Sequence, residues 1–288
     1  MNVKIATAQY NISFLDNWRA YEEKIEGWIV DATEQDAKIL LFPEYFSMEL
    51  ASLFGPDIYS SLNKQLVSMQ TLLDDFIQLF KTMAIKYQCI IQAGTFPVTF
   101  ESLIYQNRAY LFMPDGRIDY QDKLMMTRFE NEQWLIKSGQ QLKCFETVYG
   151  KIAINICYDS EFPLLARAQV EAGCVLILVP SCTDTVAGYH RVKIGCQARA
   201  LENQCYVVQA SLVGDAPWSE AVDVNVGAAA IYTPVDRGFP DNGILSVGKF
   251  NAVQWVIGEI SPTACAVVRD QGQVFNYRDW PLQKQFIN

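Results

Sequence analysis

The sequence contains one histidine, His190, in 288 residues. A cysteine or serine hydrolase that uses imidazole as its base would have only this residue available. The sequence also has no GxSxG segment, the pattern that carries a nucleophilic serine on a strand-to-helix turn. We therefore expect any hydrolytic chemistry in this chain to use a base other than histidine.

Paired cysteine motifs are absent as well. The chain has eight cysteines and no CxxC pair. With a single histidine, this spacing argues against a zinc site, and we expect no metal. Most of the cysteines lie inside apolar segments, as in YQCII and AGCVLIL, which is typical of reduced thiols in a protein core. We expect no disulfides.

Long apolar runs and basic stretches are also missing. The longest apolar runs, such as CVLILVP at 174–180, are far shorter than the roughly 18 residues of a membrane-spanning helix. The segment MNVKIATAQY lacks the apolar core of a signal peptide. The net charge is −9 and no Lys/Arg-rich stretch occurs. We expect a cytoplasmic protein that binds neither nucleic acid nor membrane and acts on a small molecule.

The hydrophobic pattern alternates between strands and helices along the chain. We expect one α/β domain covering residues 1–288, with helices outside buried sheets and two sheets packed face to face. The predicted strands are Val3–Tyr10, Ala37–Glu44, Cys89–Gly94, a hairpin over 106–118, CVLILV, Cys205–Ser211, and four late segments ending with TACAVVRD. The predicted helices are 17–30, 66–87, 164–172 and 191–202.

The segment Lys151–Pro163, KIAINICYDSEFP, places a cysteine where a buried strand turns into a helix. A thiol at such an elbow lies near a helix N-terminus, where backbone N–H groups favour a thiolate and a nearby oxyanion. Cys157 is therefore the predicted nucleophile. The alternative is a structural core thiol, because cysteine is often buried for packing alone. Asp159 more often caps a helix than reacts.

Two charged residues follow predicted strands and offer a base and a cation. Glu44 follows the apolar run in LLFPE, and Lys123 follows the MPDG hairpin. A carboxylate that emerges into a pocket has a raised pKa and can accept the thiol proton, while an ammonium can stabilise an oxyanion. The alternatives are a solvated strand end for Glu44 and a surface cation for Lys123.

Taken together, FPE, DK and CYDSEFP resemble, in the same order, the motifs of the nitrilase superfamily of carbon–nitrogen hydrolases, and of its amidase-like branch. The similarity extends through DKLMMTRFENEQW, VPSCTDT and RVKIGCQARALENQCYVVQ, so it covers nearly the whole chain. The resemblance implies a four-layer α-β-β-α sandwich. It also implies a homodimer or larger homo-oligomer, and chemistry that needs no metal or organic cofactor.

Residue by residue, the resemblance implies that Glu44 is the general base, Lys123 the oxyanion-stabilising cation and Cys157 the covalent nucleophile. It also implies Glu132 as a supporting carboxylate that positions the substrate or the lysine. Glu130, two residues earlier, is the competing choice for that role. The implied reaction is hydrolysis of a small amide through a cysteine thioester. Two alternatives remain: a nitrile substrate, and an inactive member of the family kept as a binding or scaffold protein.

Residues next to these motifs are the candidates for substrate binding: Tyr45, Tyr158, Glu161, Cys182, Thr183 and Trp218. The backbone N–H of Tyr158 is also a natural oxyanion donor. Glu161 is a departure, because many relatives that act on carboxylate-bearing substrates have an arginine at that position, four residues after the nucleophile. A glutamate near the pocket favours a neutral or amine-bearing substrate. The alternative is that Glu161 points to solvent in a first helical turn.

Overall fold

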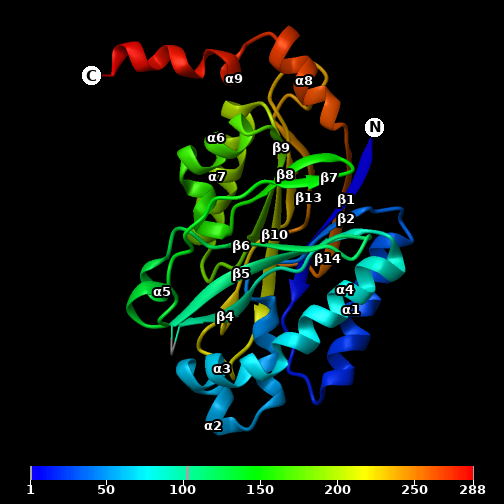
Figure 1. The fold of residues 1–288 in the computed structure, drawn as a ribbon, viewed down its shortest axis with the longest axis vertical. Helices are drawn as coiled ribbons and strands as arrows, with labels where there is room; N and C mark the ends of the chain where they lie inside the picture. Colours follow the sequence, from blue (N-terminus) through cyan, green and yellow to red (C-terminus); the bar gives the residue numbers. More distant parts are fainter. Residues whose placement is uncertain (1, 102–103, 288) are drawn as a thin grey trace.

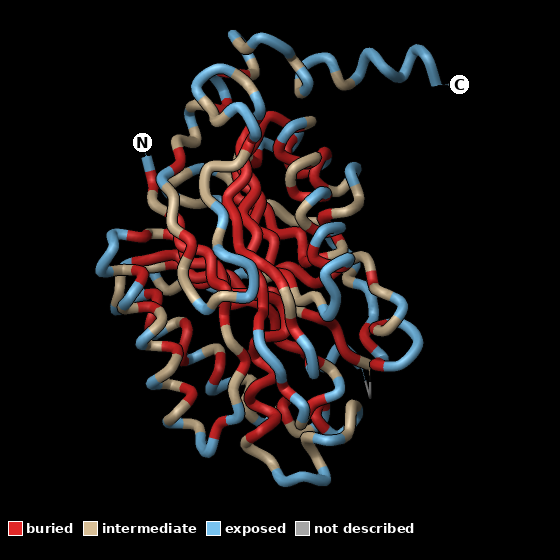
Figure 2. The backbone as a smooth tube through the Cα atoms, turned by 180° about the vertical axis from the view of Figure 1, so that it is seen from behind, coloured by how far each residue is buried: buried red, intermediate tan, exposed pale blue. Residues whose placement is uncertain are grey.

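The computed structural model describes residues 2–101 and 104–287. Both ends of the predicted domain, Met1 and Asn288, and the pair 102–103 lie outside the described residues. The described strands form one continuous β-sheet, whose two halves, the first and the second sheet, occupy the centre of the molecule. Helices cover their outer faces (Figure 1). The burial pattern in Figure 2 agrees, because the buried backbone is concentrated in the central strands. None of the helices in the described ranges is long and apolar enough to cross a membrane.

The first sheet has the order β14, β1, β2, β3, β5, β6. Strand β4 pairs with the first half of β5, and β3 pairs with the end of β5. Strands β1, β2 and β3 are parallel to one another, as helical crossovers require, whereas β14 is antiparallel to β1. The strands are β1 (Val3–Asn11), β2 (Ile39–Leu41), β3 (Ile90–Gln92), β4 (Phe96–Glu101), β5 (Ile104–Phe112), β6 (Ile118–Asp122) and β14 (Gln254–Ile260).

The second sheet has the order β7, β8, β9, β10, β12, β13, with the short β11 at the end of β10. Its strands are β7 (Phe145–Thr147), β8 (Gly150–Ile154), β9 (Cys174–Ser181), β10 (Tyr206–Asp215), β11 (Val224–Asn225), β12 (Ala230–Tyr232) and β13 (Ile244–Val247). The two sheets join where the last residues of β1 pair in parallel with β10, at Gln9–Ser211 through Asn11–Val213. The sheet therefore curls back on itself and forms the two central layers.

The helices form the two outer layers. The first layer contains α1 (Trp18–Thr33) and α4 (Leu73–Tyr87), and the second contains α6 (Pro163–Glu171) and α7 (Val186–Asn203). The alternation of side chains on β1 agrees with this arrangement. Ala6, Ala8 and Tyr10 join the core beneath α1 and α4, whereas Val3 and Ile5 join the core shared with the second sheet.

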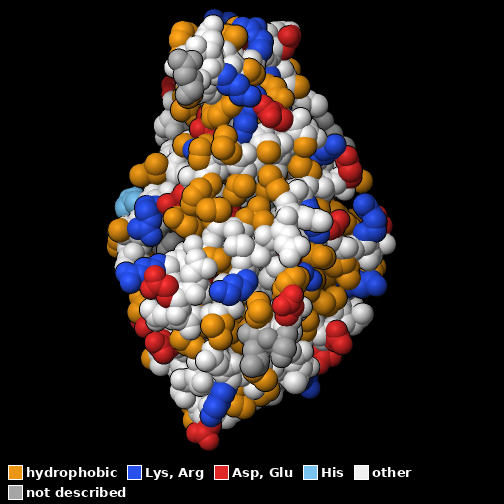
Figure 3. Space-filling view, turned by 60° about the vertical axis from the view of Figure 1, so that its left-hand side comes forward, with side chains coloured by type: hydrophobic (Ala, Val, Ile, Leu, Met, Phe, Trp, Pro, Cys, Tyr) orange, Lys and Arg blue, Asp and Glu red, His pale blue; other side chains and the backbone are white. Residues whose placement is uncertain are grey.

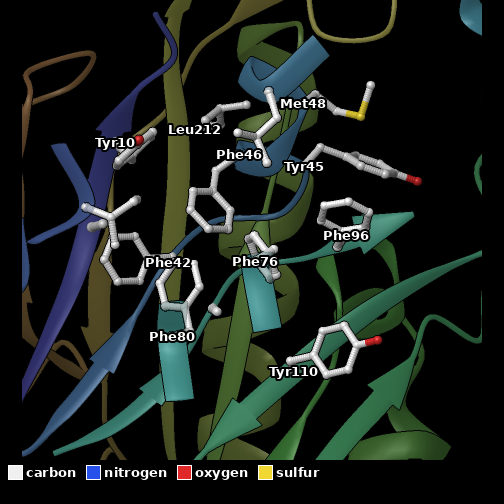
Figure 4. Close-up of a cluster of buried hydrophobic side chains, with 14 of the residues drawn as sticks. Tyr10, Phe42, Tyr45, Phe46, Met48, Phe76, Phe80, Phe96, Tyr110 and Leu212 are labelled. Carbon is white, nitrogen blue, oxygen red and sulfur yellow. The ribbon is translucent and has the colours of Figure 1, made fainter. Parts of the chain in front are cut away.

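The core beneath α1 and α4 is strongly aromatic. Figure 4 shows Phe42, Phe46, Phe76 and Phe80 packed together, with Tyr45 at the edge of the cluster and its hydroxyl pointing away from it. Phe42 and Phe46 are stacked with ring centroids 5.4 Å apart. Because these two phenylalanines flank Glu44 in the sequence, their packing fixes the backbone that carries this glutamate.

Two predicted elements differ from the structure. The helix predicted over 66–87 is divided into α3 (Leu62–Met69), the 3₁₀ turn η2 (Gln70–Leu72) and α4. The strand predicted at TACAVVRD is wrong, because this segment lies in the helix α8 (Pro262–Gln271). Pro262 fits the first helical turn, and the buried residues Cys265 and Val268 have helical spacing.

The remaining elements are short. They are η1 (Phe46–Leu53), α2 (Pro56–Tyr59), α5 (Arg128–Glu132), η3 (Cys157–Glu161), α9 (Asn276–Asp279) and η4 (Trp280–Phe286). After α8 the chain extends away from the sandwich as α9 and η4, shown in red at the top of Figure 1. The loops that matter for chemistry, around Glu44, Lys123 and Cys157, follow β2, β6 and β8 at one end of the sheets.

Candidate active site

Glu44 lies three residues after Leu41, the last residue of β2, where the backbone turns sharply. Tyr45 adopts a left-handed conformation with φ of 55°. Gly94 packs so closely that a Cβ there would collide with the carbonyl oxygen of Pro43. The buried Glu44 carboxylate accepts hydrogen bonds from Asn107 Nδ2 at 2.9 Å and from the backbone N–H of Cys182 at 3.2 Å. Segments from both sheets therefore fix its position.

Lys123 follows β6 and is 1% exposed. Its Nζ lies 2.7 Å from Glu44 Oε1 and 2.8 Å from each carboxylate oxygen of Glu130. Its backbone N–H donates to Asn107 O at 2.9 Å, and its carbonyl accepts from the N–H of Gly139 at 2.7 Å. The ammonium is therefore held between two buried carboxylates.

Cys157 is the first residue of η3, at the bend after β8. Its φ of 46° lies in the left-handed region, so the elbow is conformationally strained. Helix α7 packs against this turn at Gly195, where a Cβ would lie 2.9 Å from Ser160 O. The thiol Sγ lies 3.6 Å from the carbonyl oxygen of Cys182. The predicted strand–turn–helix elbow is therefore present, with α6 beginning at Pro163 after one 3₁₀ turn.

Asp159 connects the elbow to the loop that carries the lysine. Its carboxylate accepts from the N–H groups of Ile156 at 3.0 Å and Met125 at 2.7 Å, and from that of Leu124 at 3.1 Å. The side chain is buried, and burial raises its pKa to about 7, against the lowering effects of Lys123 and these N–H donors. Asp159 thus caps the turn, as expected, and also positions Lys123 relative to Cys157.

The second carboxylate of the site is Glu130, which corrects the choice of Glu132. Glu132 points outward and pairs with Arg128 at 2.8 Å on the exposed side of α5. Glu130 is buried, because it closes a capping box with Thr127 at the start of α5. The hydroxyl of Tyr45 donates to Glu130 Oε1 at 2.6 Å. The sequence signal that could have identified Glu130 is TRFE, which matches the capping-box pattern.

Burial and charge together set the protonation of the three groups. Burial raises the pKa of Glu44, an effect that Lys123 opposes and the Glu130 charge reinforces. Burial and then the Glu44 charge raise the pKa of the Cys157 thiol well above its usual range. Burial alone would lower the pKa of Lys123, but Glu130 and Glu44 outweigh it and hold this pKa well above its ordinary value. The resting arrangement therefore has a protonated thiol, an ammonium and a carboxyl of raised basicity within one cluster.

The site opens into a cavity of about 520 Å³, a size typical of small-molecule sites, roughly 300–1,000 Å³. Glu44, Lys123, Glu130 and Cys157 all line it. The remaining wall residues are Tyr45, Thr127, Arg128, Phe129, Trp134, Cys182, Asp184, Arg191, Glu220, Ala221, Val222, Asp223, Val224 and Asn225. Within the described ranges, no three or more His, Cys, Asp or Glu side chains are arranged to hold a metal ion.

Of the residues expected to bind substrate, Tyr45 and Cys182 line the cavity and the others do not. The ring of Tyr158 packs edge-on against Phe162, with centroids 4.9 Å apart. The Thr183 hydroxyl donates to the carbonyl of Val226 at 2.7 Å. Trp218 packs against Phe14, with ring centroids 5.3 Å apart.

Glu161 also lies outside the cavity wall, and its side chain is 21% exposed. It pairs with Arg191 at 3.6 Å. Arg191 does line the cavity, so the charge at position 161 reaches the wall only through its arginine partner.

Asn107 is a site residue that the sequence analysis missed. It lies fully buried in β5, and it contacts Glu44 through its side chain and Lys123 through its carbonyl. Its neighbours Gln106 and Arg108 are polar as well, so polarity alone did not distinguish Asn107 in the sequence. Hydrogen bonds donated to a carboxylate favour its charged form and lower its pKa, so Asn107 opposes the effect of burial on Glu44.

At low pH, kcat/KM falls as the base becomes protonated, and this part of the pH profile is its acid limb. Replacing Asn107 by leucine is expected to shift the acid limb to higher pH. The substitution removes a donor to the Glu44 carboxylate, so the pKa of Glu44 rises and activity is lost sooner as the pH falls. A loss of about tenfold in kcat/KM at neutral pH fits one hydrogen bond to a charged group. The matched control is Asn155→Leu, since Asn155 is buried and its side-chain amide has no hydrogen-bond partner in the described chain. An unmoved acid limb in Asn107→Leu, with the fold retained, would contradict this role.

Comparisons with known proteins agree with the motifs. The family model described as "Carbon-nitrogen hydrolase" matches residues 4–241. The chain is 36% identical over 277 residues to the probable hydrolase YhcX of Bacillus subtilis, a match that covers 96% of this chain and 53% of that protein. The chain thus spans about half the length of this relative. It is 27% identical over 221 residues to the omega-amidase NIT3 of Saccharomyces cerevisiae, covering 73% of each chain.

Solved structures share the fold. The structure of Saccharomyces cerevisiae Nit3, a member of branch 10 of the nitrilase superfamily, matches with a TM-score of 0.74 at 21% identity, covering 100% of this chain and 97% of that one. The structure of a mutant of the amidase from Nesterenkonia sp. AN1, with the acetamide moiety of fluoroacetamide added covalently at the active-site cysteine, matches with a TM-score of 0.72 at 17% identity, covering 100% of this chain and 97% of that one. These matches confirm the predicted α/β sandwich fold.

Proposed function

Because the chain belongs to the carbon–nitrogen hydrolase family and to the nitrilase superfamily, we propose that it hydrolyses a small linear amide through a covalent intermediate on Cys157. The observation that carries the proposal is the placement of Lys123 Nζ within 2.8 Å of both Glu44 and Glu130 in the cavity that Cys157 lines. The relatives add support, because one is an omega-amidase and another an amidase that is modified at a cysteine.

In the first half of the reaction, Glu44 takes the proton of the Cys157 thiol as sulfur attacks the amide carbonyl carbon. The carbonyl π electrons move to oxygen, and the Lys123 ammonium with the Tyr158 N–H stabilises the oxyanion. When the tetrahedral intermediate collapses, the C–N bond breaks and protonated Glu44 gives its proton to the departing nitrogen. Ammonia or an amine leaves, and the acyl group remains as a thioester on Cys157.

In the second half, Glu44 takes a proton from water, whose oxygen attacks the thioester carbonyl. The same cation and N–H stabilise the second oxyanion, and the C–S bond breaks as sulfur recovers a proton. The acid product then leaves. Glu130 acts in both halves by holding Lys123 in place and charged, because its carboxylate contacts the ammonium through both oxygens. Two products leave in sequence, so ping-pong kinetics follow.

The test is ammonia release from a panel of small primary amides and their matched nitriles, measured with purified protein. We expect release from amides, with kcat/KM for an amide above that for the nitrile of equal chain length. The Cys157→Ala protein serves as the blank for contaminating amidases. Faster turnover of nitriles would move the assignment to a nitrilase. Absence of turnover, together with a Cys157 thiol that iodoacetamide does not label at neutral pH, would favour an inactive binding or scaffold protein.

We also propose that the chain forms a homodimer or larger assembly in the cytoplasm. Figure 3 looks toward the side that carries α6 and α7 and shows hydrophobic side chains gathered across the middle of that face. Leu164 on α6 and Ile194 on α7 are 70% and 64% exposed. Large exposed apolar side chains on neighbouring helices are typical of a surface that pairs with another chain.

A further inference from the structure

The outer wall of the active-site cavity has an uneven distribution of charge. Besides the buried group Glu44, Lys123, Glu130 and Cys157, the cavity wall contains five charged residues: Arg128, Asp184, Arg191, Glu220 and Asp223. Both arginines are paired with carboxylates that lie outside the wall, Arg128 with Glu132 at 2.8 Å and Arg191 with Glu161 at 3.6 Å. Each pair is neutral as a unit.

The three acidic residues have no such compensation. In the described part of the chain, none of Asp184, Glu220 and Asp223 has a cationic side-chain nitrogen within 4.0 Å. Among the described residues, the Asp223 carboxylate accepts one hydrogen bond, from the N–H of Val224 at 2.9 Å. All three residues are exposed and also line the cavity, so their charges lie where the cavity meets solvent. The field at this entrance is therefore negative.

A second, independent feature of the same cavity also suits a cation. Three aromatic rings, those of Tyr45, Phe129 and Trp134, form a continuous part of its wall. The ring centroids of Tyr45 and Trp134 lie 4.6 Å apart, and those of Phe129 and Trp134 lie 5.8 Å apart. Aromatic faces attract ammonium groups through their quadrupole, and neighbouring rings form the cages that bind such groups.

We infer that the substrate is an amide whose far end carries a positive charge, such as an alkylammonium group. This inference rests on the proposed amide hydrolysis and specifies its substrate class. The aromatic wall and the three uncompensated carboxylates, Asp184, Glu220 and Asp223, stabilise the cation while the carboxamide reaches Cys157. A substrate with a terminal carboxylate meets like charges at the entrance and finds both arginines already paired.

The test uses three amides of equal chain length that differ only in their terminal group: 4-aminobutanamide, pentanamide and the monoamide of glutaric acid. We expect kcat/KM to be highest for the cationic amide, lower for the neutral amide and lowest for the anionic amide. The value for the cationic amide is expected to exceed that for the neutral amide at least about tenfold. This ratio of cationic to neutral kcat/KM is expected to decrease as salt is added, because exposed charges are screened. Binding of the same three compounds to the Cys157→Ala protein, measured by calorimetry, is expected to follow the same order.

The variant Asp184→Asn/Glu220→Gln/Asp223→Asn is expected to bring the cationic and neutral amides to within about threefold of each other. The readout is the ratio of kcat/KM for the cationic amide to kcat/KM for pentanamide, so an equal loss of activity toward both amides does not change it. The matched control is Asp31→Asn/Asp241→Asn/Asp270→Asn, which changes the net charge equally at exposed residues outside the cavity wall. This control is expected to retain the full preference.

The outcomes separate the two proposals. Hydrolysis of pentanamide or the anionic amide at a rate equal to or above that of the cationic amide overturns the inference and leaves amide hydrolysis standing. A preference for the cationic amide that persists in the Asp184→Asn/Glu220→Gln/Asp223→Asn variant also overturns the inference. Selective binding of the cationic amide to the Cys157→Ala protein, without turnover by the native protein, supports the cation site and contradicts the proposed function.

Discussion

Replacing Cys157 by alanine is expected to lower kcat by more than about 10⁴-fold, the range seen when a hydrolase loses its nucleophile. The substitution removes the only atom proposed to form a bond to the acyl group, and Glu44 and Lys123 cannot form a thioester without it. Cys157→Ser is expected to be nearly as inactive, because a hydroxyl is a weaker nucleophile than a thiol. Ammonia release under saturating amide measures both variants.

The fold is expected to survive this change. Alanine removes one sulfur atom. Cysteine and alanine both carry a Cβ, so the strain of a φ of 46° at position 157 is the same for the two residues. The matched control is Cys144→Ala, a half-buried thiol that is not part of the cavity wall and that should keep near-native kcat. Circular dichroism and the thermal midpoint report on folding in both proteins. Undiminished turnover by folded Cys157→Ala would exclude the thioester mechanism.

The positions of Glu44, Lys123 and Cys157 could be predicted because each follows a strand. Apolar runs mark where strands end, and the carboxyl ends of parallel strands meet at one edge of a sheet. The runs ending near Glu44 and Cys157 became β2 and β8, and Lys123 follows β6. The elbow was also predictable, since Pro163 occupies the first turn of α6.

The wall of the cavity could not be predicted in the same way. Its residues from Thr127 to Trp134 and from Glu220 to Asn225 lie mostly in short helices and loops that have no hydrophobic period. Tyr158 and Thr183 lie next to motif residues in sequence, but the Tyr158 ring packs against Phe162 and the Thr183 hydroxyl donates to the carbonyl of Val226. Proximity in sequence gave no information on the direction of a side chain at a tight turn.

The choice between Glu130 and Glu132 also depends on the direction in which a side chain points. Two residues along a helix rotate a side chain by roughly 200°, so only one of the pair can face Lys123. The capping box with Thr127 decides the outcome, because it fixes the start of α5 and turns Glu130 inward. Hydrophobic periodicity cannot assign the phase of a helix of five residues.

Glu130→Gln is therefore expected to lower kcat by about 10²–10³-fold, comparable to the loss of one oxyanion-stabilising donor. The amide can still accept from Thr127, but it no longer supplies the charge that holds Lys123 Nζ at 2.8 Å. Without that charge Lys123 is expected to pair more closely with Glu44 and to move away from the oxyanion. Glu132→Gln is the matched control, and it should stay within about twofold of native kcat because Glu132 forms an exposed ion pair with Arg128.

The pH profile distinguishes a positioning role of Glu130 from a purely structural one. The Glu130 charge raises the pKa of Glu44, whereas Lys123 lowers it. Removing the Glu130 charge lowers the pKa of Glu44, so the acid limb of kcat/KM should move to lower pH, opposite to its expected movement in Asn107→Leu. A variant that was merely less stable would have a lower kcat/KM at every pH, but the acid limb would stay at the same pH. If Glu132→Gln shifts the acid limb and Glu130→Gln does not, then the supporting carboxylate is Glu132, and the contact between Lys123 and Glu130 does not govern the reaction.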